Sequence, residues 1–186
     1  MRYAILSQQD IRRARDLAAV TCLVIICAVL SACDTTRPSV TADIANLRAL
    51  EATFFEYDNQ GRIVTISSTG AFNDRDLEQL RSTPDLTALY LLDCRVTDSG
   101  LKHIVDNHNL KHLALNSAPV SDRGVKLLSR MSQLLYLDLE YTRITDACVP
   151  DLLKLTNLKT LSIENSHLSE LAKSRLRKGL PKTAIW

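Results

Sequence analysis

The chain has 186 residues, of which 46% are hydrophobic and 24% are charged, in the proportions of a globular domain. Only five Gly and five Pro occur, which excludes a low-complexity or collagen-like chain. There are 23 Lys and Arg against 21 Asp and Glu, and the formal net charge of +2 at pH 7 is too small to indicate a nucleic-acid partner.

Residues 1–32 have the layout of a secretory signal peptide. Four Arg lie ahead of an apolar run at residues 17–30, LAAVTCLVIICAVL. The run ends in Leu30-Ser31-Ala32-Cys33, which resembles the lipobox of bacterial lipoproteins. That resemblance implies cleavage before Cys33 and a lipid on its thiol. It also implies a protein anchored to the cell membrane and facing the periplasm or the exterior.

An uncleaved transmembrane anchor is the alternative, because residues 17–33 approach the roughly 17–25 residues that a spanning helix needs. Both interpretations tether the chain to a membrane. Cleavage would remove four Arg and two Asp and leave 19 basic and 19 acidic residues. The mature chain is therefore not expected to attract polyanions such as nucleic acid.

Residues 33–41 are predicted to form a tether, and residues 42–186 a repeat domain. Ile44, Leu47 and Leu50 recur every three residues, which predicts an amphipathic helix. The segment TFFEYDNQGRIVTIS follows, with two apolar stretches around a D-N-Q-G turn, which predicts a β-hairpin. We expect this helix and hairpin to cap the first repeat.

A unit of 24 residues then recurs without a gap, after one copy that carries an extra residue. The five repeats span residues 61–85, 86–109, 110–133, 134–157 and 158–181. In the four regular copies the first, fourth and sixth places are apolar, as in Leu86, Leu89 and Leu91. The spacing of two predicts a strand with both side chains on one face, and a later spacing of three predicts a helix.

The pattern L-x-x-L-x-L, followed by C-R-V-T-D-S-G-L or T-R-I-T-D-A-C-V, resembles the leucine-rich repeats that have Cys or Thr at the ninth place. This resemblance implies an α/β fold, namely a right-handed solenoid with a parallel concave sheet and outer helices. Five repeats would stack between an N-terminal helix–hairpin cap and a C-terminal strand cap. We expect a monomer.

The twelfth and thirteenth places predict the start of each helix. The twelfth holds residues that commonly cap helices: Asn73, Thr97, Ser121, Thr145 and Ser169. The thirteenth holds acidic residues, which the helix dipole favours: Asp74, Asp98, Asp122, Asp146 and Glu170. Asp146 is therefore predicted to begin a helix and not to act as a catalytic acid.

Cys94 and Cys148 lie two repeats apart, so roughly 10 Å should separate them, beyond the reach of a disulfide. We predict two buried, free thiols. Pro150 would break a hydrogen bond inside a helix, so the helix of that repeat is expected to begin late, near Pro150.

At the other end, the segment LPKTAIW predicts a last strand in which Ile185 or Trp186 closes the sheet. Basic residues surround this segment: Lys173, Arg175, Arg177, Lys178 and Lys182. A solvated face is the simpler interpretation of this cluster, and a lipid-binding patch is the alternative.

The third, fifth, seventh and eighth places should point out onto the concave sheet, where they can contact a partner. The predicted binding residues combine aromatic and acidic side chains: Tyr90, His112, Tyr136, Asp138, Glu140, Tyr141 and Glu164. Tyr commonly anchors interfaces, so we expect a partner with basic or hydrogen-bonding groups. The alternative is a polar sheet face that meets only solvent.

No catalytic, metal-binding or cofactor-binding residues are predicted. His108 and His112 do not share one helical turn as the two His of H-E-x-x-H do, and no glycine-rich phosphate loop occurs. The sequence therefore predicts a membrane-anchored, extracytoplasmic binding module for a protein or an envelope polymer. A spacer lipoprotein without a ligand is the alternative, and an envelope hydrolase is a remote one.

Overall fold

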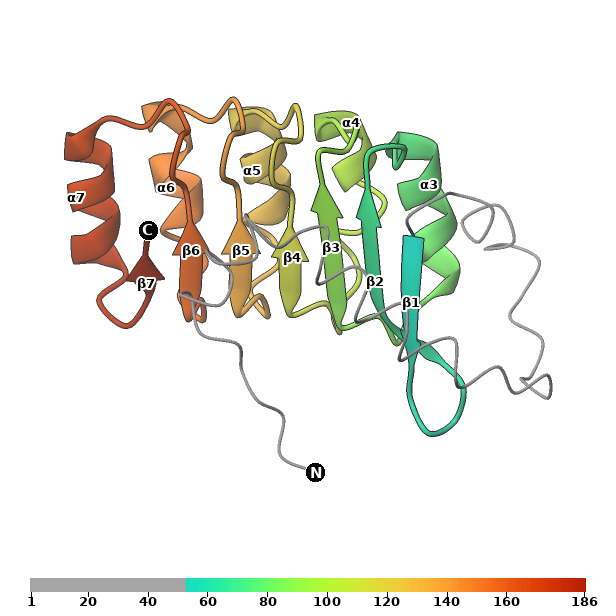
Figure 1. The fold of residues 1–186 in the computed structure, drawn as a ribbon. Coiled ribbons are helices and arrows are strands. Elements are labelled where there is room, and N and C mark those ends of the chain that lie inside the picture. Colours follow the sequence, from blue (N-terminus) through green and yellow to red (C-terminus); the bar gives the residue numbers. More distant parts are fainter. Residues whose placement is uncertain (1–52) are drawn as a thin grey trace, which may run out of the picture. The chain divides into compact units, whose positions relative to one another are not determined.

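The computed structural model describes residues 53–186, so the predicted leader, tether and N-terminal helix lie outside the described residues. Strands and helices alternate along this part of the chain, and the helices lie side by side on one face of the sheet (Figure 1). The strands are β1 (Thr53–Tyr57), β2 (Ile63–Thr69), β3 (Ala88–Leu92), β4 (His112–Ala114), β5 (Tyr136–Asp138), β6 (Thr160–Ser162) and β7 (Ala184–Ile185). The helices are α3 (Asp74–Gln79), η2 (Leu80–Ser82), α4 (Asp98–Leu101), α5 (Asp122–Leu128), η3 (Asp146–Cys148), α6 (Val149–Leu152) and α7 (Glu170–Gly179), where η2 and η3 are 3-10 turns.

The seven strands of the described part form one sheet and lie in the order of the sequence. β1 and β2 pair antiparallel, which confirms the predicted hairpin. Each later strand is parallel to the strand before it, as expected when one helix separates successive strands. β7 pairs with β6, so the predicted C-terminal strand is confirmed as well.

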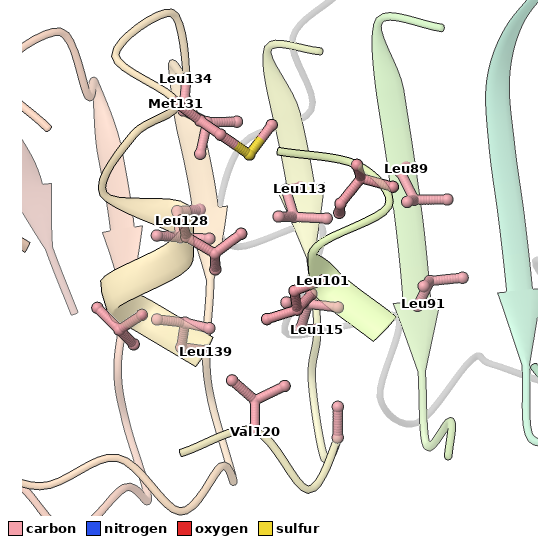
Figure 2. Packing of buried hydrophobic residues seen from close by; sticks show 14 of the residues in the cluster. Leu89, Leu91, Leu101, Leu113, Leu115, Val120, Leu128, Met131, Leu134 and Leu139 are labelled. Carbon is pink, nitrogen blue, oxygen red and sulfur yellow. The ribbon is translucent and has the colours of Figure 1, made fainter. Parts of the chain in front are cut away.

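The strand register aligns the leucines of successive repeats. Leu113 lies opposite Leu89 on one side, and Leu137 lies opposite both Leu113 and Leu161. All four side chains are fully buried, and the strand and helix leucines point into one interior (Figure 2). Burying a leucine stabilises a fold by roughly 1.5–3 kcal/mol, so this column is a main source of stability. The stacked repeats confirm the predicted solenoid.

All five predicted cap residues accept a hydrogen bond from a backbone N–H in the first turn that follows. In the fourth repeat, for example, the Thr145 hydroxyl accepts from the Ala147 N–H at 3.3 Å. Each cap satisfies one donor that the helix start leaves without a partner.

Four of the five acidic residues beside the caps also bind the cap residue of the next repeat, a contact that we did not predict. Asp122 Oδ1 accepts from the Thr145 N–H, and Asp122 Oδ2 accepts from the Thr145 hydroxyl, both at 2.7 Å. The same pair of bonds recurs in three other repeats, as Asp74–Thr97, Asp98–Ser121 and Asp146–Ser169. These four aspartates, called the aspartate ladder below, join each repeat to the next. Glu170 has no later repeat to join and pairs with Lys173 at 2.9 Å.

In the second and third repeats, glycine lets the helix start lie close to the aspartate ladder. A Cβ at Gly100 would collide with the Asp74 carboxylate, and one at Gly124 would lie 2.5 Å from Asp98 Oδ1. Cys148 occupies this place in the fourth repeat, where the 3-10 turn η3 precedes α6.

Pro150 lies in the first turn of α6, where its missing N–H costs no hydrogen bond. The predicted late start of this helix is confirmed.

Both Cys94 and Cys148 are free and buried, as predicted. Burial, and then the charge of Asp122, raise the pKa of the Cys148 thiol to about 12. Burial also raises the pKa of the Cys94 thiol. Since the thiolate is the reactive form, both side chains act as small apolar core residues.

Candidate binding surface

The face of the sheet that points away from the helices, called the open sheet face below, carries the third, fifth and seventh places of each repeat. The strand register sorts its side chains into rows. One row contains Thr65, Ala88, His112, Tyr136, Thr160 and Ala184. The next contains Ser67, Tyr90, Ala114, Asp138 and Ser162. This face corresponds to the predicted concave surface, and four of the seven predicted site residues lie in these two rows.

His112 and Tyr136 form the aromatic centre of the open sheet face. Their rings are stacked, with centroids 6.3 Å apart and an angle of 25° between the planes. The side chain beside them, Ala114, is small and buried. Burial, and then the charge of Lys111, lower the pKa of His112, so its imidazole is neutral at pH 7.

Tyr90 and Tyr136 are half-buried and keep their hydroxyl protons. Burial, followed by the charges of Asp138 and Glu140, raises the pKa of Tyr136 well above its usual value, and a hydrogen bond with Ser162 opposes this shift. Burial, followed by the charge of Glu56, raises the pKa of Tyr90. Both side chains therefore offer a ring face and a phenol in a negative electrostatic environment.

The carboxylates of this face differ in exposure. Asp138 is only 9% exposed, and its Oδ1 accepts a hydrogen bond from the Glu140 N–H at 2.9 Å. Glu140 and Glu164 are more exposed and lie at the seventh place of successive repeats. Asp138 is one of the predicted binding residues, and from this position it can fix the backbone of Glu140 and add negative charge to the face.

Tyr141 lies at the edge of this face in a left-handed backbone conformation, with φ at 56°. The same eighth place is left-handed in Asp93, Ser117 and Asn165. Asn and Asp tolerate this conformation far better than an aromatic residue does. Tyr141 as a whole residue is 44% exposed, so a residue in a strained backbone conformation presents an aromatic side chain at the rim.

The structure adds three residues that sequence reasoning did not assign to this face. Phe54 and Glu56 lie opposite Ser67 and Thr65 in the hairpin, and opposed residues share a face. Ile185 pairs with Leu161 of the core column, so Trp186, the next residue, points to the open sheet face. Side chains alternate between the two faces of a strand, so applying this rule to the hairpin and the last strand would have assigned all three residues to the open sheet face.

One pocket of the described chain lies away from the open sheet face. A pocket of about 530 Å³ lies at the junction of the first two repeats, lined by residues such as Arg81, Pro84, Lys102 and His103, and it includes no residue of the open sheet face. Within residues 53–186, no three His, Cys, Asp or Glu side chains are placed to hold a metal ion. None of the helices in this range has the length and apolar character needed to span a bilayer. Cys33, the predicted lipidation site, lies outside the described residues.

Similarity to known proteins is confined to the repeat architecture. The family described as Leucine Rich repeat matches residues 106–129. No match is found among the curated proteins.

Several solved structures are similar to this chain at low identity. A leucine-rich-repeat protein of Leptospira interrogans is 24% identical, with a TM-score of 0.46, over 59% of this chain and 27% of that one. An internalin of Listeria monocytogenes is 20% identical, with a TM-score of 0.43, over 58% of this chain and 36% of that one. The ectodomain of the Arabidopsis thaliana receptor kinase SOBIR1 is 17% identical, with a TM-score of 0.45, over 72% of this chain and 84% of that one.

The chain thus spans about a quarter to a third of the first two structures. The matched segment has the length of one repeat, and the stacked strands and helices repeat at the same interval. Together they identify the fold as an α/β leucine-rich-repeat solenoid.

Proposed function

We propose that this chain is an interaction module whose open sheet face binds a protein that presents Arg or Lys side chains. The leucine-rich-repeat fold suits an interaction module, and one observation carries the choice of partner. Aromatic rings and carboxylates gather on the same face, around the stacked His112–Tyr136 pair.

Each part of this face favours a cationic side chain. A cation over an aromatic ring gains about 0.5–1 kcal/mol at an exposed site and about 2 kcal/mol or more when water is excluded. A carboxylate beside the ring adds a charge-assisted hydrogen bond, in which an Arg can engage both oxygens. The residues proposed to contact the partner are Tyr90, His112, Tyr136, Glu140, Tyr141 and Glu164, with Asp138 orienting Glu140.

Capture from an envelope extract tests this proposal. The bait carries Tyr136→Ala and Glu140→Ala together, beside the unchanged chain. A control bait carries Arg123→Ala and Lys126→Ala on the exposed outer side of α5. We expect one discrete protein that the open-face variant loses and the control retains, with binding that weakens as salt increases.

Identical capture by all three baits would contradict the proposal and favour a spacer without a specific ligand. Capture of a polysaccharide in place of a protein would favour an envelope polymer as the partner.

We also propose that a lipid on Cys33 anchors the chain to the outer side of a cell membrane. The support is the apolar run before Leu30-Ser31-Ala32-Cys33. Metabolic labelling with a palmitate analogue should mark the protein and should not mark Cys33→Ala. Membrane retention of an unlabelled, full-length chain would instead indicate an uncleaved anchor.

A further inference from the structure

Charge is distributed unevenly along the stack of repeats. Residues 53–109 contain nine Asp and Glu against five Lys and Arg, whereas residues 158–186 contain six Lys and Arg against two Glu. The solenoid therefore has an acidic end at the hairpin and a basic end at the last repeat.

The basic end has exposed cations. Arg175, Arg177, Lys178 and Lys182 are all exposed. Glu170 pairs with Lys173 at 2.9 Å, and no carboxylate of residues 53–186 forms an ion pair with the other four. Asp146 and Glu170 do feel the charges of Arg175 and Arg177, but at longer range.

An apolar side chain lies among these cations. Leu171 is 62% exposed, the highest value among the large apolar residues exposed in the described part. Its equivalents in the other repeats are polar or small: Arg75, Ser99, Arg123 and Ala147. Leu171, Arg175 and Lys178 follow at intervals of four and three, so they share one face of α7.

We propose that Leu171 and the exposed cations of the last repeat, namely Arg175, Arg177, Lys178 and Lys182, rest on the anionic headgroups of a lipid bilayer. These five residues are called the basic cap below. The proposal rests on the membrane tether proposed above. An exposed apolar side chain with Arg and Lys on the same helix face is an arrangement that favours binding to anionic lipids. Each cation near such a surface increases the binding constant by about fivefold, so the four exposed cations together can orient a tethered domain.

Lysine acetylation of the full-length chain tests this proposal. The protein is reconstituted in vesicles of phosphatidylcholine alone or with added phosphatidylglycerol, and a membrane-impermeant reagent modifies its exposed lysines. When phosphatidylglycerol is present, we expect the acetylation rates of Lys178 and Lys182 to fall by a factor of about five or more. Lys102 and Lys126, which are exposed on other repeats, should react at the same rate in both vesicles.

Two variants sharpen the result. Arg175→Gln with Arg177→Gln removes two cations and should weaken binding to the anionic lipid about 25-fold, so the lipid-dependent protection of Lys178 and Lys182 should be largely lost. Arg75→Gln with Arg81→Gln removes two exposed arginines from the acidic end and should leave the lipid-dependent protection of Lys178 and Lys182 unchanged. Unfolding midpoints of both variants check that the fold is intact.

The proposal would be overturned if each of the four lysines reacted at the same rate with and without phosphatidylglycerol. Protection that requires an added acidic protein and not the lipid would overturn it as well. Flotation with pure phosphatidylcholine vesicles reports the tether separately. A chain that fails to float there contradicts the tether, whereas lipid-independent labelling of a floating chain contradicts the basic cap alone.

Discussion

The aspartate ladder and the open sheet face both cross the repeats, but they differ in how much their residues vary. The ladder uses the same side chain four times: Asp74, Asp98, Asp122 and Asp146. The fifth place of the open face differs in every regular repeat: Tyr90, Ala114, Asp138 and Ser162. A contact that must form in every repeat requires the same residue each time. A place that varies is not needed for stacking and is available for recognition.

The largest expected effect is the difference in stability loss between a core leucine and a leucine on the open sheet face. Leu137→Ala removes a fully buried side chain from the middle of the leucine column and should destabilise the fold by about 2–5 kcal/mol. Leu92→Ala, on the open sheet face and 37% exposed, should change stability by about 0.5 kcal/mol or less. Urea unfolding of both variants measures the difference, and similar losses would contradict the assignment of faces.

Gly100→Ala tests the close packing of the second repeat's helix start on the aspartate ladder. In a helix this change usually stabilises by up to about 1 kcal/mol. Here the new Cβ meets the Asp74 carboxylate, so we expect a net loss of about 1–3 kcal/mol in thermal unfolding. In the last repeat, the place of Gly100 is already occupied by an alanine, Ala172. A more stable Gly100→Ala variant would show that the contact relaxes without cost.

Asp122→Asn tests the ladder itself. It replaces a carboxylate that accepts two hydrogen bonds from Thr145, and we expect a loss of about 1–2 kcal/mol. Glu170→Gln is the matched control, because Glu170 has the same place but no later repeat to join. Its pair with Lys173 is exposed to solvent and should contribute little to stability. If chemical denaturation gives the same loss of stability for both changes, these acidic residues stabilise the protein only through the helix dipole and not by joining the repeats.

The smallest effect should have the opposite sign. Tyr141→Asn relieves a left-handed aromatic residue, so we expect a gain of roughly 0.5–1 kcal/mol together with weaker capture of the partner. Such a gain would mark Tyr141 as a residue kept for binding at a cost in stability. Differential scanning calorimetry and the capture assay, applied to the same preparation, measure both. A loss of stability would show that the ring supports the fold.

Much of the fold could be predicted because the repeats are equivalent to one another. The column through Leu113 and Leu137, the caps such as Thr145, the late helix at Pro150 and the buried Cys148 all follow from a place within the repeat. Periodicity identifies which residues correspond, and local rules then assign their roles.

Contacts between different places of neighbouring repeats could not be predicted in this way. Asp122 reaches Thr145 across 23 residues, which depends on how closely two coils approach. The low exposure of Asp138 depends on the size of the side chains around it, and the position of Trp186 depends on the register of a two-residue strand. These features come from packing in three dimensions and leave no periodic pattern in the sequence.

Deletion of one repeat tests the central claim most directly, namely that each 24-residue unit is one interchangeable turn of a single stack. Deleting residues 110–133 joins Asn109 to Leu134 and brings Asp98 to the Thr145 cap, whereas deleting residues 110–121 removes half a turn. We predict that the first deletion retains a cooperative unfolding transition at a lower midpoint and that the second has none. Two cooperative transitions, or none in either chain, would contradict the account.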